Sequence, residues 1–137
     1  MVAAAVAPDA VAYMPRGGCM EFYTAREPEV LAVGPAGTGK TLAACWKLHH
    51  TALRVPNVRI LMVRKVLEDL KAGALATYTN QVRPELDSVR TFGGNRFYPG
   101  EFRYDNGSVL QVVGMDKPGK VMSAEYDVIY VNEATEL

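Results

Sequence analysis

Cysteine is scarce in this chain of 137 residues, which has only Cys19 and Cys45. The two stand too far apart for a Cys-x-x-Cys motif and are too few for a disulfide framework. No apolar run approaches the roughly 20 residues of a transmembrane helix. The Ala/Val-rich start lacks the basic region of a secretory signal, so we expect residues 1–15 to be a loose N-terminal arm. These absences favour a globular protein in a reducing, cytoplasmic setting.

The chain has no net charge, because 15 Lys and Arg balance 15 Asp and Glu. The balance is uneven along the chain. Residues 54–103 hold nine basic against five acidic residues, an excess of four positive charges, and residues 104–137 hold two against six. The basic middle would suit nucleic acid, although a solvated surface of mixed charge explains it more simply.

Apolar patterning predicts alternating strands and helices. The run 29–33 stops abruptly at a glycine and indicates a buried strand, and 58–63 indicates a second one. Between them, apolar positions recur at helical spacing, as they do again from 65 to 82. The two helical faces predicted to be apolar contain Leu42, Cys45, Trp46, His49 and Leu53 in the first helix and Leu67, Leu70, Ala74, Tyr78 and Val82 in the second.

The second half of the chain predicts a hairpin followed by a third buried strand. Runs at 102–104 and 109–113 flank Asp105-Asn106-Gly107-Ser108, and Asn-Gly between strand-like runs is a strong hairpin signal. The third strand spans 126–131 and leads into acidic residues. This order predicts an α/β fold with a mostly parallel sheet. A sheet of this kind ordinarily has more strands, so we expect an incomplete domain over 16–137, with an open edge, exposed apolar surface and poor solubility.

The most specific motif is Gly34-Pro35-Ala36-Gly37-Thr38-Gly39-Lys40-Thr41, which fits the phosphate-binding P-loop pattern G-x-x-x-x-G-K-[ST] in full. Glycines let backbone N–H groups turn toward phosphate oxygens, and the following helix directs its positive dipole end at the same place. Lys40 would hold the β- and γ-phosphates of ATP, and the Thr41 hydroxyl would bind Mg²⁺.

An acidic residue follows the third strand, where hydrolysis would need one. Glu133 is the expected catalytic carboxylate, since the carboxyl ends of parallel strands share one edge of the sheet. The preceding position holds Asn132, which can position a Mg²⁺-bound water but brings no charge. The expected metal-binding residues are therefore Thr41, Asn132 and Glu133.

Taken together, the motifs resemble the ATPase domain of the large subunit of tailed-phage terminases, over roughly residues 13–137. The resemblance rests on 34–41, on Met62-Val63-Arg64-Lys65, on 104–108, on 114–118 and above all on 122–137, which joins the acidic strand to a polar lead-in. It implies a P-loop NTPase three-layer sandwich, truncated after the acidic strand, with the family's nuclease domain absent.

The resemblance also implies function. Such domains hydrolyse ATP with Mg²⁺ to drive double-stranded viral DNA into a procapsid. They work as homo-oligomers with a terminase small subunit and a portal protein, in the host cytoplasm and transiently at the procapsid portal. Arg64 matches an arginine of the family and is a candidate phosphate sensor or arginine finger, with a salt bridge or a DNA contact as the alternative.

Other residues have weaker claims. Lys120 and Ser123 would contact nucleotide or a neighbouring subunit, or lie in an ordinary loop. Tyr23, after Arg16, would stack on adenine or, more simply, pack in the core. His49 and His50 would interact with the C-terminal dipole of the first helix.

Two other functions fit the same motifs. One is a different P-loop ATPase, such as a helicase-like protein. The other is a nucleotide-binding assembly module that does not turn over ATP.

Overall fold

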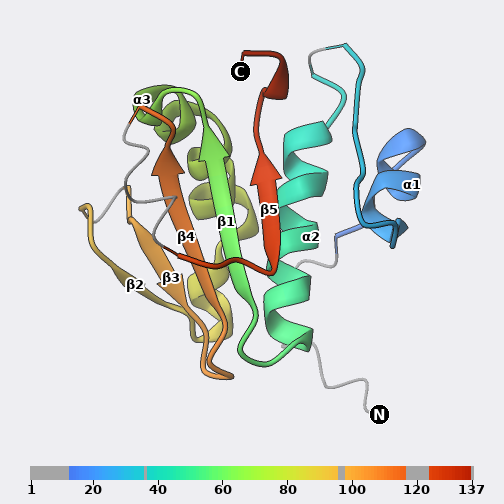
Figure 1. The fold of residues 1–137 in the computed structure, drawn as a ribbon. Coiled ribbons are helices and arrows are strands. Elements are labelled where there is room, and N and C mark those ends of the chain that lie inside the picture. The colour runs from blue at the N-terminus through green and yellow to red at the C-terminus, as the bar shows by residue number, and fades with distance from the viewer. Residues whose placement is uncertain (1–12, 36, 96–97, 117–123, 137) are drawn as a thin grey trace.

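A five-stranded sheet forms the centre of the computed structural model, which describes residues 13–35, 37–95, 98–116 and 124–136 (Figure 1). The strand order is β2-β3-β4-β1-β5. Strands β4, β1 and β5 run parallel, while β3 runs antiparallel to both of its neighbours. The predicted α/β class with a mostly parallel sheet is therefore confirmed. The strands are β1 (Arg59–Arg64), β2 (Arg90–Phe92), β3 (Glu101–Arg103), β4 (Val109–Gly114) and β5 (Val128–Val131).

The described helices are short apart from α2. Both long helical predictions are confirmed, but the second helix, after α3, widens into π-helical turns that its apolar spacing did not indicate. None of these helices is long and apolar enough to cross a bilayer. The helices are α1 (Gly18–Thr24), α2 (Lys40–Arg54), α3 (Leu67–Leu70), the π-helical η1 (Lys71–Leu75) and η2 (Tyr78–Val82), and the 3₁₀ turns η3 (Pro84–Asp87) and η4 (Ala134–Glu136).

The main core lies between one face of the sheet and the helices α2, α3, η1 and η2. Alternate residues of β1, Ile60 and Met62, point into it, as the period of two in a strand requires. The opposite face carries a smaller cluster of Leu61, Val63 and Val113, to which no described helix contributes. The helices that contribute to the core, α2, α3, η1 and η2, therefore all cover the same face of the sheet.

The buried face of α2 differs in part from the prediction. Cys45 and His49 are buried as expected, and Leu42 and Trp46 pack partly against the core. Leu53, predicted to be apolar and inward, is instead 41% exposed. The buried side of α2 instead includes the small residues Ala43, Ala44 and Ala52, of which Ala52 belongs to the main core.

The strand predicted at 29–33 is wrong. These residues form no strand, and Leu31 and Val33 are 77% and 83% exposed. An apolar run becomes a buried strand only when a neighbouring strand pairs with it. In Figure 1 the segment runs up beside α1 toward the start of α2, apart from the sheet.

The predicted hairpin is confirmed, with β3 and β4 paired from Arg103–Val109 to Glu101–Gln111. The turn requires glycine at 107, where φ is +89° and a Cβ would lie 2.1 Å from Asn57 Oδ1. β2 adds a third antiparallel strand that the sequence pattern did not indicate.

β5 confirms the third predicted strand but is shorter than 126–131 and only partly buried. It pairs with β1 on one side, from Ile60–Val128 to Val63–Val131, and ends the sheet on the other. Ile129 is 56% exposed. The expected open edge and exposed apolar surface are thus present in the described residues.

Candidate functional site

The glycine-rich segment turns sharply into α2. Gly37 and Gly39 adopt φ values of +78° and +84°, in the left-handed region that glycine tolerates best. The Thr38 hydroxyl donates to the Pro35 carbonyl at 2.9 Å and closes the turn. α2 then begins at Lys40, so its unpaired N-terminal N–H groups and positive dipole end lie at this turn.

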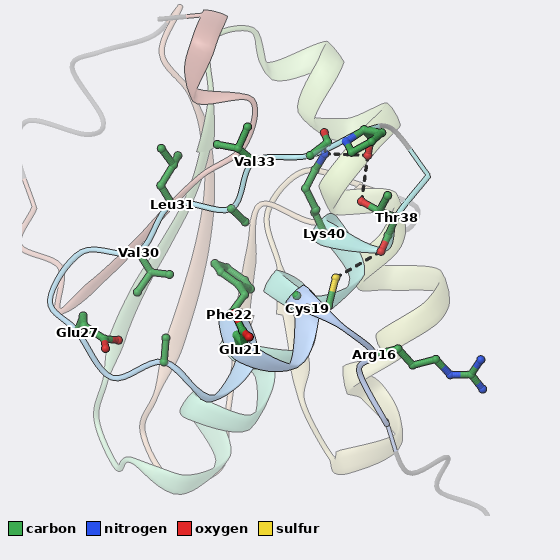
Figure 2. A pocket seen from close by; sticks show the side chains of 15 residues that line it. Arg16, Cys19, Glu21, Phe22, Glu27, Val30, Leu31, Val33, Thr38 and Lys40 are labelled. Carbon is green, nitrogen blue, oxygen red and sulfur yellow. Dashed lines mark hydrogen bonds between the residues drawn. The ribbon is translucent and has the colours of Figure 1, made fainter.

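Lys40 folds back over the turn. Its ammonium donates to the carbonyl oxygen of Gly34 and, at 3.0 Å, to that of Pro35 (Figure 2). These carbonyl oxygens accept hydrogen bonds that the Lys40 ammonium would otherwise donate to an anionic ligand. A phosphate entering here would compete for the ammonium with two neutral acceptors, and it would add an attraction between opposite charges that the carbonyls lack.

An open groove of about 610 Å³ adjoins the turn, between α1 and the extended segment 29–35 (Figure 2). Its apolar side comes from Phe22, Val30, Leu31 and Val33, and Lys40 and Thr38 line its end at the turn. Arg16 lines it as well and is exposed. Cys19 connects α1 to the turn, because its thiol donates to the Thr38 carbonyl at 3.3 Å. The groove thus combines an apolar wall with a cationic end.

Tyr23 does not line this groove. Its hydroxyl forms a hydrogen bond with His50 Nδ1, and its ring makes an edge contact with Tyr13, 5.7 Å between centroids. Tyr13 in turn stacks on Trp46 at 5.4 Å. Tyr23 is therefore a packed aromatic residue, the simpler of its two interpretations.

A chain of polar contacts joins the start of α2 to the end of β5. The Thr41 side chain lies beside the Tyr130 hydroxyl and lowers the pKa of the phenol against the larger effect of burial. Tyr130 accepts a hydrogen bond from Asn132 Nδ2 at 2.9 Å. The side chains of residues 130 and 132 reach each other because they lie on the same side of an extended strand. Burial of the phenol raises the pKa of Tyr130 to about 12, so its hydroxyl stays protonated at neutral pH.

Arg64 continues this chain from the end of β1. The backbone N–H of Asn132 donates to the Val63 carbonyl at 2.8 Å. This bond extends the β1–β5 pairing and brings Asn132 beside Arg64. Arg64 Nη1 lies 3.4 Å from Asn132 Oδ1. The guanidinium also donates two hydrogen bonds to the Glu136 carboxylate in η4, from Nε to Oε2 at 3.0 Å and from Nη2 to Oε1 at 2.9 Å. The hydrogen bond to Glu136 raises the pKa of Arg64, and its counterpart lowers the pKa of Glu136.

Glu133 stands at the mouth of this arrangement. It follows Asn132 directly, its side chain is exposed, and its φ is +55°. Non-glycine residues seldom adopt a positive φ, and such strained positions cluster at functional sites. The strain turns the chain away from the strand and into η4.

The described residues therefore bring together most of the predicted site. Arg64 and Asn132 belong to one hydrogen-bonded chain that ends at Tyr130, beside Thr41. Glu133 adjoins this chain in sequence, and Lys40 lies one residue from Thr41. Ala36, Lys120 and Ser123 lie outside the described residues. Sequence reasoning missed Tyr130 and Glu136. Their spacing was the available signal, two residues before Asn132 on the strand and three after Glu133.

Magnesium fits the donor types of this site. Thr41 and Glu133 offer hydroxyl and carboxylate oxygens, ligands that Mg²⁺ prefers, whereas the amide oxygen of Asn132 is buried and faces the Arg64 guanidinium. Only Glu133 is charged, and no group of three or more His, Cys, Asp or Glu residues that would hold a metal occurs in the part of the chain described. The site suits an ion for which the protein supplies only part of the coordination shell, while phosphate oxygens and water supply the rest.

A second polar cluster lies buried at the other end of α2. His49 is fully buried, with Nδ1 2.7 Å from the Tyr104 hydroxyl and Nε2 2.7 Å from Asp87 Oδ2. The Tyr104 hydroxyl also bonds to that of Tyr78. The two histidines are thus held by side chains of other segments, and the dipole interaction predicted for them does not describe their surroundings.

These histidines make stability sensitive to acid. Burial lowers the pKa of His49, outweighing Asp87, and burial with the nearby His49 and Arg54 lowers that of His50 from 6.5 to about 4. Between these values the unfolded chain binds protons that the folded chain does not. The free energy of unfolding is therefore highest above pH 6.5, where these histidines are neutral in both states, and it decreases as the pH falls toward 4.

We therefore expect the urea midpoint to fall between pH 7 and pH 5, and to fall less in His50→Gln, which removes one titrating group. Chemical unfolding followed by circular dichroism at the two pH values checks this. An equal fall in the parent and the variant would contradict the assignment to His50.

Comparison with known proteins gave no match to a protein-family model, to a curated protein or to a solved structure.

Proposed function

We propose that this chain binds ATP with Mg²⁺ and hydrolyses it, as the motor domain of a tailed-phage terminase large subunit. The observation that carries the proposal is the position of Thr41 beside Tyr130, whose hydroxyl accepts a hydrogen bond from Asn132. It ties the glycine-rich turn to the end of β5, so that Lys40 and Glu133 serve the same edge of the sheet. A P-loop NTPase needs this pairing of a phosphate cradle with a carboxylate.

Each residue then has a defined role. The turn over 34–39 and the start of α2 bind the phosphates, and Lys40 exchanges its two carbonyl partners for the β- and γ-phosphates. Thr41, with Asn132 and Glu133 nearby, would hold Mg²⁺, which would neutralise part of the phosphate charge. The exposed Glu133 carboxylate orients the attacking water and accepts its proton. Arg64 stabilises charge on the transferred phosphoryl group.

The proposed work of the domain is ATP-driven movement of double-stranded viral DNA into a procapsid. Support comes from the residues shared with terminases and from the basic middle of the chain, of which Arg54, Arg59 and Arg90 are exposed. The resemblance to terminases is the sole basis for proposing a homo-oligomer, a small subunit and a portal protein as partners, and the host cytoplasm as the location. The three-layer sandwich likewise remains a proposal, since the described helices cover one face.

The test of the proposed chemistry is Glu133→Gln. Removing the carboxylate while keeping its size takes away the general base, so we expect phosphate release to fall by about 10²- to 10⁴-fold. Affinity for Mg²⁺-ATP should stay within a few-fold of the parent value. Phosphate release and titration with a fluorescent ATP analogue measure the two quantities on the 137-residue chain.

Glu85→Gln provides a matched control, because Glu85 is an exposed glutamate of η3, away from β5. Equal phosphate release by parent and Glu133→Gln would contradict the role of Glu133. Tight ATP binding with no release by the parent would favour the module that does not turn over. Stimulation by single-stranded but not double-stranded DNA would favour the helicase-like alternative.

A further inference from the structure

Arg64 is held by three groups at once. Its Nε and Nη2 atoms are engaged by the two oxygens of Glu136, while Nη1 faces Asn132 Oδ1 and the Asp69 carbonyl, each at 3.4 Å. The guanidinium side chain is only 19% exposed and that of Glu136 34%. The two parallel hydrogen bonds, and not burial, set this pair apart from an ordinary surface ion pair.

The bond to Glu136 has the geometry of a phosphate contact. Guanidinium presents a planar fork of N–H donors that matches the two oxygens of a carboxylate and, equally, two oxygens of a phosphate. A phosphate group and the Glu136 carboxylate would therefore compete for the same face of Arg64. Occupation by one excludes bidentate binding of the other.

Glu136 is placed to make this competition depend on the nucleotide site. It belongs to η4, which begins directly after Glu133, and the Glu136 N–H donates to the Glu133 carbonyl at 3.0 Å. On the other side, Asn132 joins Arg64 to Tyr130, which lies beside Thr41 at the start of α2. A change at Glu133 would reach the Arg64–Glu136 pair through one hydrogen bond, and a change at the turn would reach it through Tyr130 and Asn132.

We propose that Glu136 is a positioning residue that holds Arg64 when no nucleotide is bound and yields it to the terminal phosphate of ATP. The inference rests on the proposed function. Its consequence is specificity: ADP has no γ-phosphate to compete with Glu136, so Arg64 stays paired in the ADP complex. ATP binding bears the cost of opening the pair, and ADP binding does not.

Glu136→Gln tests this directly. Glutamine keeps the size of the side chain but removes the charge that holds Arg64, so the affinity for Mg²⁺-ATP should rise by about three- to ten-fold. The affinity for Mg²⁺-ADP should not change. Titration of fluorescent ATP and ADP analogues gives the ratio of the two dissociation constants, which a purely structural role of Glu136 would not alter.

Three further variants sharpen the result. Glu136→Asp keeps the charge and should restore most of the parent ratio. Arg64→Ala should lower the preference for ATP, and adding Glu136→Gln to it should have no further effect, because the residue that Glu136 holds is gone. Glu68→Gln is the matched control, since Glu68 forms a 3.0 Å ion pair with Lys71 on the surface of the adjoining helix.

The outcomes separate this inference from the function on which it rests. If the parent binds both nucleotides and Glu136→Gln leaves the ATP-to-ADP ratio unchanged, the holding role is wrong and ATP binding stands. An additive double variant would likewise overturn it. If the parent binds neither nucleotide, the proposed function fails, and this inference fails with it.

Discussion

Replacing Lys40 by alanine is expected to lower the affinity for Mg²⁺-ATP by about 30- to 100-fold, or roughly 2–3 kcal/mol. The magnitude is that of hydrogen bonds to charged groups, which contribute about 1.5–3 kcal/mol. In the nucleotide-free chain the ammonium already lies over the turn, bonded to the Gly34 and Pro35 carbonyls. It therefore needs little reorganisation to meet a phosphate.

The measurement is a titration with a fluorescent ATP analogue, accompanied by thermal unfolding. Lys71→Ala is the control, because Lys71 is also a helical lysine with a hydrogen-bonded partner but lies in η1. The melting temperature of Lys40→Ala should stay close to that of the parent, since its contacts are with an exposed loop. Unchanged ATP affinity in a folded Lys40→Ala protein would remove the P-loop interpretation altogether.

The largest effect on stability is expected from Phe102→Ala, which should lower the free energy of unfolding by about 3–5 kcal/mol. Phe102 is fully buried in β3, opposite Leu110, and its ring packs edge-on against Tyr78 with 4.9 Å between centroids. Its removal loses apolar burial and leaves a cavity under the hairpin.

Phe92→Ala provides a control of identical chemistry on the neighbouring strand. Phe92 is 41% exposed and carries the Arg103 guanidinium over its ring at 4.0 Å, so its loss should cost less than about 1.5 kcal/mol. Urea unfolding of both variants at pH 7.5, above the range in which the histidines titrate, gives the comparison. Similar losses in the two variants would mean that the core is not centred where the burial places it.

Local patterns predicted the elements whose partners are close in sequence. The Asn106-Gly107 turn specified its hairpin because only a short loop had to close. The face of Leu70, Ala74, Tyr78 and Val82 was correct because helical periodicity persists even where the turns widen to π geometry.

The failures have a common physical cause, which is dependence on a distant partner. Residues 29–33 are as apolar as β1, yet apolar composition does not reveal whether a strand is there to pair with them. Leu53 was misplaced because Leu48 and Ala52 fill the buried side of the second half of α2, and packing sets this choice, not periodicity.

The site shows the same division. The P-loop motif predicted 34–41 as a phosphate-binding turn from local chemistry, and the end of a strand predicted Glu133 as the carboxylate. Glu136 and Tyr130 were missed because their roles come from Arg64 and Thr41, which lie far away in the sequence. Such contacts exist only once the sheet is assembled.

The pairing of β1 with β5 has a consequence for the order of folding. The hydrogen bond from the Arg59 N–H to Asp127 closes a span of 68 residues, and the Arg64–Asn132 contact closes the same span at the other end of the pair. Helices and the β3–β4 hairpin close short loops and form within microseconds, whereas distant parallel pairing must first overcome the entropy of a long loop. We therefore expect β5, which leads into Asn132 and Glu133, to pair with β1 after the helices and the hairpin have formed. The proposed nucleotide site would then be among the later parts of the chain to acquire its shape.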